Sequence, residues 1–152
     1  MTNHLHLIVN CDEPFSLKDA IRDFKRFTAR TIIKQIIQEP ESRRENFLSI
    51  FKTNTHRRSN NSMYKFWKSG NHAIEIYSEK FLWNKIHYIH NNPVVAKFVE
   101  KPEHWLYSSA SNYLEEPSIF PEVIVLPQIM KSVNWYFIPQ QCNCCGARVL
   151  YI

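Results

Sequence analysis

The sequence begins MTNHLHLIVN, a strand-like run with two histidines one residue apart. Side chains alternate between the two faces of a β-strand, so His4 and His6 share one face. At a rise of about 3.3 Å per residue, the two side chains leave the backbone ~7 Å apart, and their imidazoles can lean onto one metal ion. For this motif taken alone, a half-buried strand with two hydrogen-bonded histidines is the favoured alternative.

A second group of polar side chains lies in the segment SEKFLWNKIHYIHNN, whose apolar residues repeat with helical spacing. Its predicted buried stripe consists of Leu82, Ile86 and Ile89. Tyr88 and Asn92 are four residues apart and therefore share another face, with Lys85 one turn before Tyr88. Pro93 is expected to stop this helix, which places the Asn92 side chain at its end.

A long amphipathic helix is predicted before these groups, from Ser16 as N-cap to about Gln38, where Glu39-Pro40 ends it. Its apolar face consists of Leu17, Ile21, Phe24, Thr28, Ile32 and Ile36. Its other face carries a row of cations at steps of four, namely Lys18, Arg22, Arg26, Arg30 and Lys34. Asp19 and Asp23 partly balance this row, which is typical of a solvated face. A row of cations is also what contact with a phosphate backbone requires.

Basic and aromatic residues dominate the segment between the two predicted helices. A short helix and a loop are predicted for residues 41–62, which contain Arg43, Arg44, Arg57 and Arg58. The next segment, MYKFWKSGNHAIEIY, predicts a hairpin-like pair of strands. Three aromatic residues interleave here with two lysines, namely Tyr64, Lys65, Phe66, Trp67 and Lys68. This composition suits the stacking of bases and the neutralisation of phosphates, with core packing as the alternative.

The composition indicates one globular domain with a polyanionic partner. The 152 residues are 44% hydrophobic and 22% charged, and 19 Lys and Arg against 14 Asp and Glu give a net charge of +5. The chain has 2 glycines, which excludes glycine-rich phosphate loops. No apolar run reaches the ~18 residues of a membrane span, and no signal-peptide pattern is present. We therefore expect no membrane partner and a cytoplasmic location.

The four cysteines are Cys11, Cys142, Cys144 and Cys145. They lack the paired C-x-x-C spacing of a structural zinc site, so we expect reduced thiols. A zinc-binding protein built on the three C-terminal cysteines is a minor alternative.

Several segments, in this order, resemble the single-tyrosine HUH transposases, and specifically the branch of REP-associated tyrosine transposases. The matching segments are MTNHLHLIV, LKDAIRDFKRFTAR, FWKSGNH, YIHNNPV and EHWLYSSASNY. The H-x-H motif alone is weak, whereas its combination with the later motifs at these separations is specific. The resemblance covers Met1 to about Tyr113 and implies an incomplete HUH catalytic domain at residues 1–113, followed by a C-terminal extension at residues 114–152.

The resemblance implies an α+β fold, a ferredoxin-like antiparallel sheet with helices on one face. It also implies metal-assisted cleavage and rejoining of single-stranded or hairpin DNA through a 5′-phosphotyrosine. Carried over by position, His4 and His6 are metal ligands, Asn92 is the third ligand and Tyr88 is the nucleophile. Glutamine stands at the Asn92 position in the insertion-sequence branch. The implied cofactor is a divalent metal, Mg²⁺ or Mn²⁺, and the chain is expected to act as a monomer or a homodimer.

The cations of both helices and of the segment between them are the predicted DNA contacts. They are Lys18, Arg22, Lys25, Arg26, Arg30, Arg43, Arg44, Arg57, Arg58, Lys65, Lys68 and Lys85. Such contacts supply affinity for the backbone without sequence information.

The chain departs from the family pattern at its beginning. In the family, a strand, a helix and a second strand precede the histidine motif, whereas this chain starts at the methionine of that motif, and Thr2 replaces the usual proline. We therefore expect an N-terminally truncated copy or a mis-called start, with an unpaired edge on the histidine strand. The alternative function is a catalytically inactive remnant that acts at most as a DNA-binding module.

Overall fold

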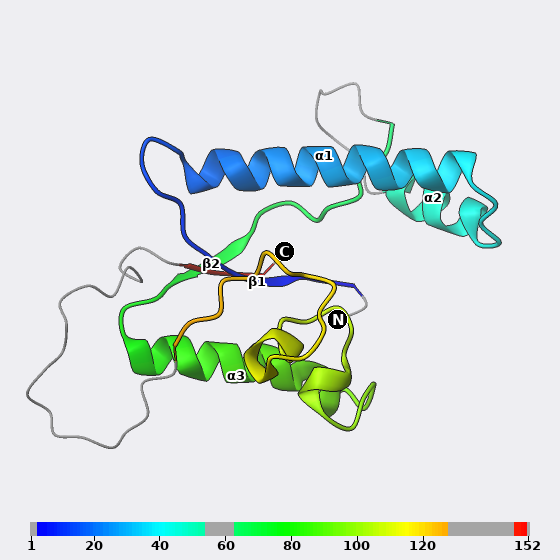
Figure 1. Ribbon diagram of the computed structural model, residues 1–152. Helices are drawn as coiled ribbons and strands as arrows, with labels where there is room; N and C mark the ends of the chain where they lie inside the picture. The colour runs from blue at the N-terminus through cyan, green and yellow to red at the C-terminus, as the bar shows by residue number, and fades with distance from the viewer. Residues whose placement is uncertain (1–2, 54–62, 128–147, 152) are drawn as a thin grey trace, which may run out of the picture. The chain divides into compact units, whose positions relative to one another are not determined.

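The computed structural model describes residues 3–53, 63–127 and 148–151, and these residues are mostly helical (Figure 1). The elements in chain order are β1 (His6–Val9), α1 (Leu17–Gln38), α2 (Arg44–Thr53), β2 (His72–Glu75), α3 (Glu79–Val95), the 3₁₀ helices η1 (Pro102–His104) and η2 (Ser111–Leu114), and β3 (Arg148–Tyr151). No helix in these described ranges is long and apolar enough to cross a membrane.

The chain divides into two compact units. We call Met1–Val9 together with Ala73–Tyr151 the site unit, and Asn10–His72 the helical unit. The boundary predicted at Tyr113 follows from the family resemblance rather than from contacts, and it stays a prediction. Cys11 belongs to the helical unit and is a free, partly buried thiol, whereas the three C-terminal cysteines lie outside the described residues.

The strands are short, with four residues in each. β1 pairs antiparallel with β3, with His6 opposite Tyr151 and Val9 opposite Arg148, and β3 lies between β1 and β2. β1 is therefore an edge strand of this sheet among the described residues, paired with β3 on one side, and the predicted unpaired edge is its other side. A ferredoxin-like βαββαβ arrangement has four strands, so the predicted sheet is not seen among the described residues. The described residues contain helices and short strands.

In the helical unit, α1 begins and ends where the sequence predicts. Ser16 is the N-cap in extended backbone, and Glu39 is the C-cap, directly before the proline that cannot continue a helix. The Arg44 guanidinium at the start of α2 donates to the carbonyl oxygens of Ile36, at 2.9 Å, and Glu39. These bonds satisfy carbonyls that the last turn of α1 leaves without helical partners, so Arg44 joins the two helices.

Partly buried aromatic rings contact one another in the helical unit. The ring centroids of Phe51 and Phe66 are 5.2 Å apart, and those of Phe66 and Trp67 are 5.0 Å apart, both edge-to-face. The Trp67 indole also lies 6.1 Å from the ring of Phe24 on α1 and donates to the Thr28 hydroxyl at 2.9 Å. These contacts are the core-packing alternative for Phe66 and Trp67, because rings held in this way are not free to stack on bases.

The hairpin predicted for residues 63–77 is wrong. A single strand, β2, forms in this segment. The Lys65 amide donates to the Phe51 carbonyl at 2.9 Å, so the backbone before Gly70 bonds to the end of α2 rather than to a partner strand. Gly70 has a φ of 79°, a left-handed conformation that glycine adopts at no steric cost.

In the site unit, α3 packs its predicted apolar stripe into the core. Leu82 and Ile86 are 3% and 5% exposed and form a cluster with Ile76. Ile8 from β1 packs against this cluster, which fixes the histidine strand next to α3. Burial of each such side chain stabilises the unit by about 1.5–3 kcal/mol relative to an exposed position.

The prediction that Pro93 stops α3 is wrong, because the helix continues to Val95. A proline removes one backbone hydrogen bond, here the bond to the carbonyl four residues earlier. The Ala96 amide donates to the Asn92 carbonyl at 2.9 Å, and the Pro93 ring is buried, so the last turn keeps its other stabilising contacts. At the other end, the Ser78 hydroxyl accepts from the Phe81 amide at 3.2 Å as the N-cap.

Candidate active site

The segment from His4 into β1 and the helix α3 bring together the four residues to which the resemblance assigns chemistry. The ring centroids of His4 and His6 are 4.8 Å apart, and the ring of Tyr88 lies edge-on, 6.0 Å from that of His6. The Asn92 amide nitrogen lies 3.5 Å from His6 Nε2. All four belong to the site unit, and 86 residues of sequence separate Asn92 from His6. The convergence is therefore a property of the fold and not of local sequence.

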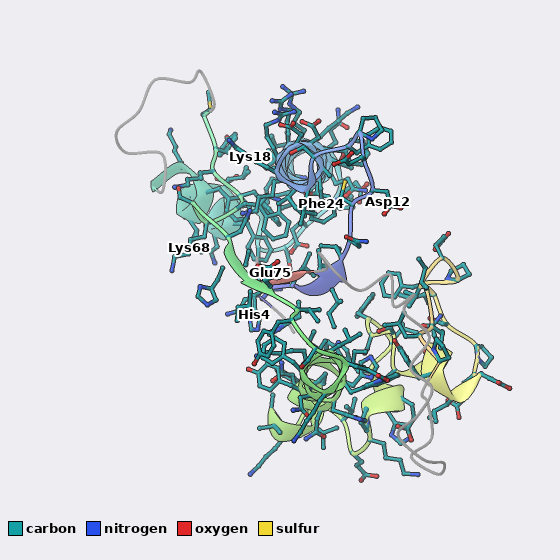
Figure 2. All side chains as sticks on the ribbon, turned by 90° about the vertical axis from the view of Figure 1, so that its left-hand side faces the viewer. His4, Asp12, Lys18, Phe24, Lys68 and Glu75 are labelled. Carbon is teal, nitrogen blue, oxygen red and sulfur yellow. The ribbon has the colours of Figure 1, made fainter. Side chains whose placement is uncertain are left out.

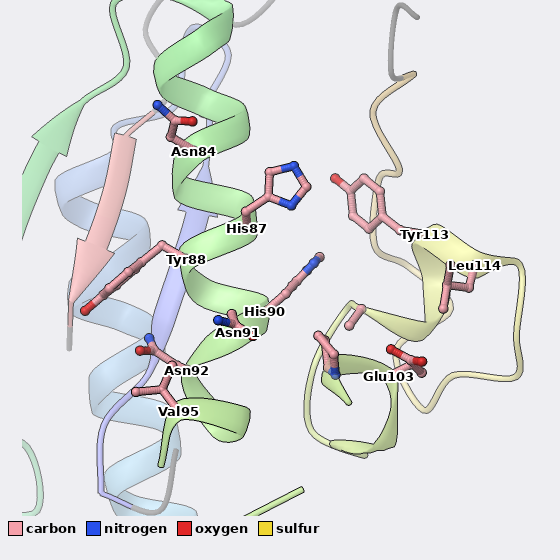
Figure 3. Close-up of a pocket in the computed structure, with 12 residues that line it drawn as sticks. Asn84, His87, Tyr88, His90, Asn91, Asn92, Val95, Glu103, Tyr113 and Leu114 are labelled. Atoms are coloured by element: carbon pink, nitrogen blue, oxygen red, sulfur yellow. The ribbon is translucent and has the colours of Figure 1, made fainter. Parts of the chain in front are cut away.

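The helix α3 presents three faces with different roles. One faces the core, and a second carries His87 and His90 toward Tyr113 of η2, where the His90–Tyr113 ring centroids are 5.3 Å apart. Tyr88 and Asn92 project from the opposite side of the helix (Figure 3). Residues at steps of three and four share a helix face, so this third face, which we call the site face, comprises Phe81, Lys85, Tyr88 and Asn92.

The donor set suits a divalent metal ion. His4 Nδ1 lies 2.6 Å from the Asn3 side-chain oxygen. In the tautomer with the proton on Nδ1, His4 donates to this oxygen and its Nε2 is left as the ligand nitrogen. Asn92 contributes an amide whose oxygen and nitrogen are exchanged by a simple rotation. Imidazole nitrogen and amide oxygen together fit Mn²⁺ and, less well, Mg²⁺, which prefers oxygen.

The histidine pair has no acidic third ligand among the described residues, which matters for its substrate. Among the described residues, no group of three or more His, Cys, Asp and Glu side chains is placed to hold a metal. The described side chain that lies beside the histidine pair is the neutral amide of Asn92, 3.5 Å from His6 Nε2. An ion held by neutral ligands keeps its full charge for an anionic substrate.

His6 is held in the form that binds metal. Burial, followed by the proximity of His4, lowers the pKa of His6 from 6.5 to about 4. The neutral imidazole therefore prevails at neutral pH, and it is the neutral ring that donates a lone pair to a metal.

Tyr88 is accessible to a large substrate, with 51% of its side chain exposed. The Lys85 ammonium lies between two rings, 5.8 Å from the Tyr88 centroid and 5.1 Å from that of Phe81. A cation above a ring face is attracted to its negative quadrupole. It would interact still more favourably with the phenolate of a tyrosine than with the neutral phenol.

A cavity of ≈ 900 Å³ is lined by the C-terminal half of α3 and by residues of η1 and η2 (Figure 3). It touches Tyr88 and Asn92 on one side and His90 and Tyr113 on the other. His90 hydrogen-bonds through Nε2 to the Ser109 hydroxyl at 2.9 Å. Burial, followed by the nearby His87, lowers the pKa of His90 from 6.5 to about 4. His90 is thus a packed, neutral histidine that ties α3 to the segment before η2.

Local partners already engage many of the cations predicted to bind DNA. Arg22 pairs with Asp19 and Asp23, and Arg26 lies 3.8 Å from Asp23. Lys25 donates to the Gly70 carbonyl at 2.9 Å, and burial lowers the pKa of its ammonium. These are structural contacts of the helical unit. The same holds for Arg44, described above, and for Arg43, whose guanidinium lies 4.9 Å from the Phe47 ring centroid.

Other cations among the predicted DNA contacts or in the cationic row of α1 have no salt-bridge partner among the described residues. No salt bridge among the described residues involves Lys18, Arg30, Lys34, Lys65 or Lys68. Lys18 lies on α1 and Lys68 precedes β2 (Figure 2), and both belong to the helical unit. Arg57 and Arg58 lie outside the described residues.

Sequence reasoning missed three residues around the site. Asn3 precedes the histidine motif directly, and its amide is the kind of group that orients a metal-binding histidine. Tyr77 stacks on Phe81 with centroids 4.5 Å apart. The third missed residue is Phe81 itself, and its spacing of four residues from Lys85 was the signal that places both on one face of α3.

Searches against protein-family models, curated proteins and solved structures found no match for this chain. The geometry of the site and the sequence motifs are therefore what a functional proposal rests on.

Proposed function

We propose that this protein is a DNA transposase-like enzyme of the single-tyrosine HUH type. It would cleave and rejoin single-stranded or hairpin DNA, as a monomer or a homodimer. The observation that supports this proposal is the convergence of His4, His6, Asn92 and Tyr88 in one unit, at ring separations of 4.8 and 6.0 Å. The ferredoxin-like sheet of the family belongs to the same proposal.

The metal would be held by His4 Nε2, His6 and the Asn92 amide oxygen, and would supply Lewis-acid stabilisation of charge on the scissile phosphate. The protein's own contribution is to hold the phenol of Tyr88 beside that phosphate. Tyr88 projects from the middle of a regular helix, which fixes its backbone position. Side chains on rigid elements hold reacting atoms more accurately than side chains on loops.

In the proposed step, the Tyr88 oxygen attacks phosphorus, and the bond from phosphorus to the 3′-oxygen breaks. The segment on the 3′ side of the cut becomes linked to Tyr88 through its 5′-phosphate. The segment on the 5′ side leaves with a 3′-hydroxyl. In net terms, the proton lost by the phenol is gained by the 3′-oxygen. The phosphotyrosine conserves the ester bond, so the reverse step rejoins DNA without an external energy source.

A second candidate is a DNA-binding module without catalysis. The cations without salt bridges on α1, such as Lys18, Arg30 and Lys34, favour it, because they can neutralise phosphates whether or not Tyr88 reacts.

Covalent capture of DNA separates the two candidates. Single-stranded hairpin DNA, labelled on the 3′ side of the candidate cleavage points, is mixed with the protein and Mn²⁺ or Mg²⁺ and analysed on a denaturing gel. A transposase gives a labelled protein band that Tyr88→Phe and His6→Ala both lose. Labelled DNA that binds under native conditions but never becomes covalently attached would instead identify the binding module.

His87→Ala is the matched control. His87 lies on α3 next to Tyr88 but projects from the opposite side (Figure 3). Its replacement should leave the labelled band in place, whereas loss of the band in this variant would mean that general damage to α3 explains the other losses.

A further inference from the structure

We infer that Tyr77, which precedes the N-cap of α3, together with Phe81 and Lys85 on α3, forms a binding track for single-stranded DNA that leads to Tyr88. This inference rests on the proposed function for the identity of its ligand, because it assigns the track to one flank of the scissile phosphate. The track, which we call the aromatic strip, belongs entirely to the site unit.

The strip is continuous in contact. Tyr77 stacks on Phe81 with ring centroids 4.5 Å apart and planes at 25°. The Lys85 ammonium lies 5.1 Å from the Phe81 centroid and 5.8 Å from that of Tyr88. Ring, ring, cation and ring thus follow one another along the helix and end at the proposed nucleophile.

Packing accounts for Phe81, which contacts the core cluster of Ile76, Leu82 and Ile86, but not for Tyr77. A residue just before an N-cap often packs on the first turn of a helix, and such a contact is stabilising when the residue is covered. Tyr77, however, is 77% exposed. Phe81 covers one face of its ring and leaves the other open, where a base can stack.

The charge of this face fits a nucleic acid. The Glu79 carboxylate lies near by in sequence, but the Trp83 indole donates to it at 3.4 Å on another face of α3. The strip itself carries the cation of Lys85 and no acidic group. Proteins bind single strands by alternating aromatic stacking platforms with cations that track the backbone.

The dimensions also fit. Seven residues separate Phe81 from Tyr88, which is about 10 Å along a helix axis. Stacked nucleotides rise about 3.4 Å each, so the distance from Phe81 to Tyr88 corresponds to about three of them. Bases in a duplex are stacked on one another and present no free face, so the strip is suited to a single strand.

The test measures base stacking and affinity together, in the absence of cleavage. Single-stranded oligonucleotides carry 2-aminopurine at successive positions on both flanks of the candidate cleavage point, and anisotropy gives the affinity. Tyr77→Ala should weaken binding about tenfold, as loss of one stacked base does, and should abolish fluorescence quenching at a block of neighbouring positions. Tyr77→Trp should retain both the affinity and the quenching. Lys85→Met should reduce the salt dependence of binding by about one phosphate contact.

Two matched controls lie off the strip. Tyr107 is 67% exposed in the same unit, and Lys80 is an exposed lysine of α3. Tyr107→Ala and Lys80→Met should change affinity less than twofold. Equal weakening in the controls and in the strip variants would overturn the strip as a defined track.

The outcomes for the strip and for the proposed reaction are separable. A covalent adduct with unchanged quenching in Tyr77→Ala overturns the strip and leaves the transposase chemistry intact. Quenching that depends on Tyr77, with no adduct under any metal condition, supports the strip and overturns the reaction. Wild-type protein that binds no single-stranded DNA overturns both.

Discussion

The site unit and the helical unit differ in the contacts made by the residues that the sequence predicted to be functional. In the site unit, the histidines, Asn92 and Tyr88 converge, and Tyr88 keeps 51% of its side chain exposed. In the helical unit, Trp67 and Arg22 are engaged by neighbours in the same unit. A specific spacing of side chains therefore predicted four residues that the structure brings together, whereas a composition of aromatics and cations selected residues engaged in packing and ion pairs.

The largest expected effect is the loss of adduct formation in the site unit by a substitution that keeps its fold. Tyr88→Phe removes one exposed hydroxyl and keeps the ring that packs near His6. Because the nucleophile is lost outright, adduct formation should fall by at least about 10³-fold. Single-turnover capture on hairpin DNA measures the rate. Circular dichroism should give the same spectrum as wild type, and retained adduct formation would exclude Tyr88 as the nucleophile.

The next effect concerns the aromatic contacts of the helical unit. Trp67→Ala removes the indole that contacts Phe24 and Phe66 and donates to Thr28, and it should lower the free energy of unfolding by about 3 kcal/mol. Urea unfolding followed by circular dichroism measures the change. Tyr77→Ala is the matched aromatic control, because its exposed ring should contribute little to stability. If Trp67→Ala were as stable as wild type but bound DNA poorly, the base-stacking interpretation of Trp67 would return.

A smaller effect comes from the buried His90 of the site unit. Its pKa of about 4 lies below the usual 6.5, so the unfolded chain takes up a proton first as the pH falls. Its contribution to stability is complete above pH ~6.5 and is lost as the pH falls toward 4, by about 2 kcal/mol after allowance for partial solvent access.

His90→Gln isolates this contribution. Glutamine keeps a neutral partner for the Ser109 hydroxyl and does not titrate. The difference in unfolding free energy between the variant and wild type should change between pH 7 and pH 4.5, while the titration of His6 cancels because both proteins contain it. A difference that stays constant over this range would show that His90 is not buried as described.

The smallest effect is a difference in DNA affinity between two kinds of cations on α1, those with and those without salt bridges. Arg30, which has no salt bridge among the described residues, should contribute to DNA affinity, and Arg30→Ala should weaken it about threefold at low salt. Arg22→Ala should have almost no effect, because Asp19 and Asp23 already neutralise Arg22. Salt-dependent anisotropy measures both variants. Equal losses would mean that the ion pairs of Arg22 open on binding.

The sequence predicted features that depend on short-range rules. Ser16 and Glu39-Pro40 bound α1 because caps and prolines act locally, and Leu82 and Ile86 are buried because their spacing follows the helix period. Pro93 was misjudged, because its cost is one hydrogen bond and burial of its ring offsets part of that cost.

Features that depend on distant partners could not be predicted. β3 lies in a segment without a clear pattern, and its pairing with β1 joins opposite ends of the chain. The position of His6 beside Asn92 depends on how β1 packs against α3, and periodicity does not specify that packing. For these four site residues, family motifs supplied the expected set, and the structure supplied the distances.

The most direct test of the central proposal is to identify the residue that becomes linked to DNA. The protein is incubated with single-stranded hairpin DNA and Mn²⁺, digested with nuclease and trypsin, and analysed by tandem mass spectrometry. We expect a nucleotide attached through its 5′-phosphate to Tyr88, in a metal-dependent yield. Attachment to another tyrosine, such as Tyr113, or no attachment by a folded protein that binds the DNA, would contradict the proposal.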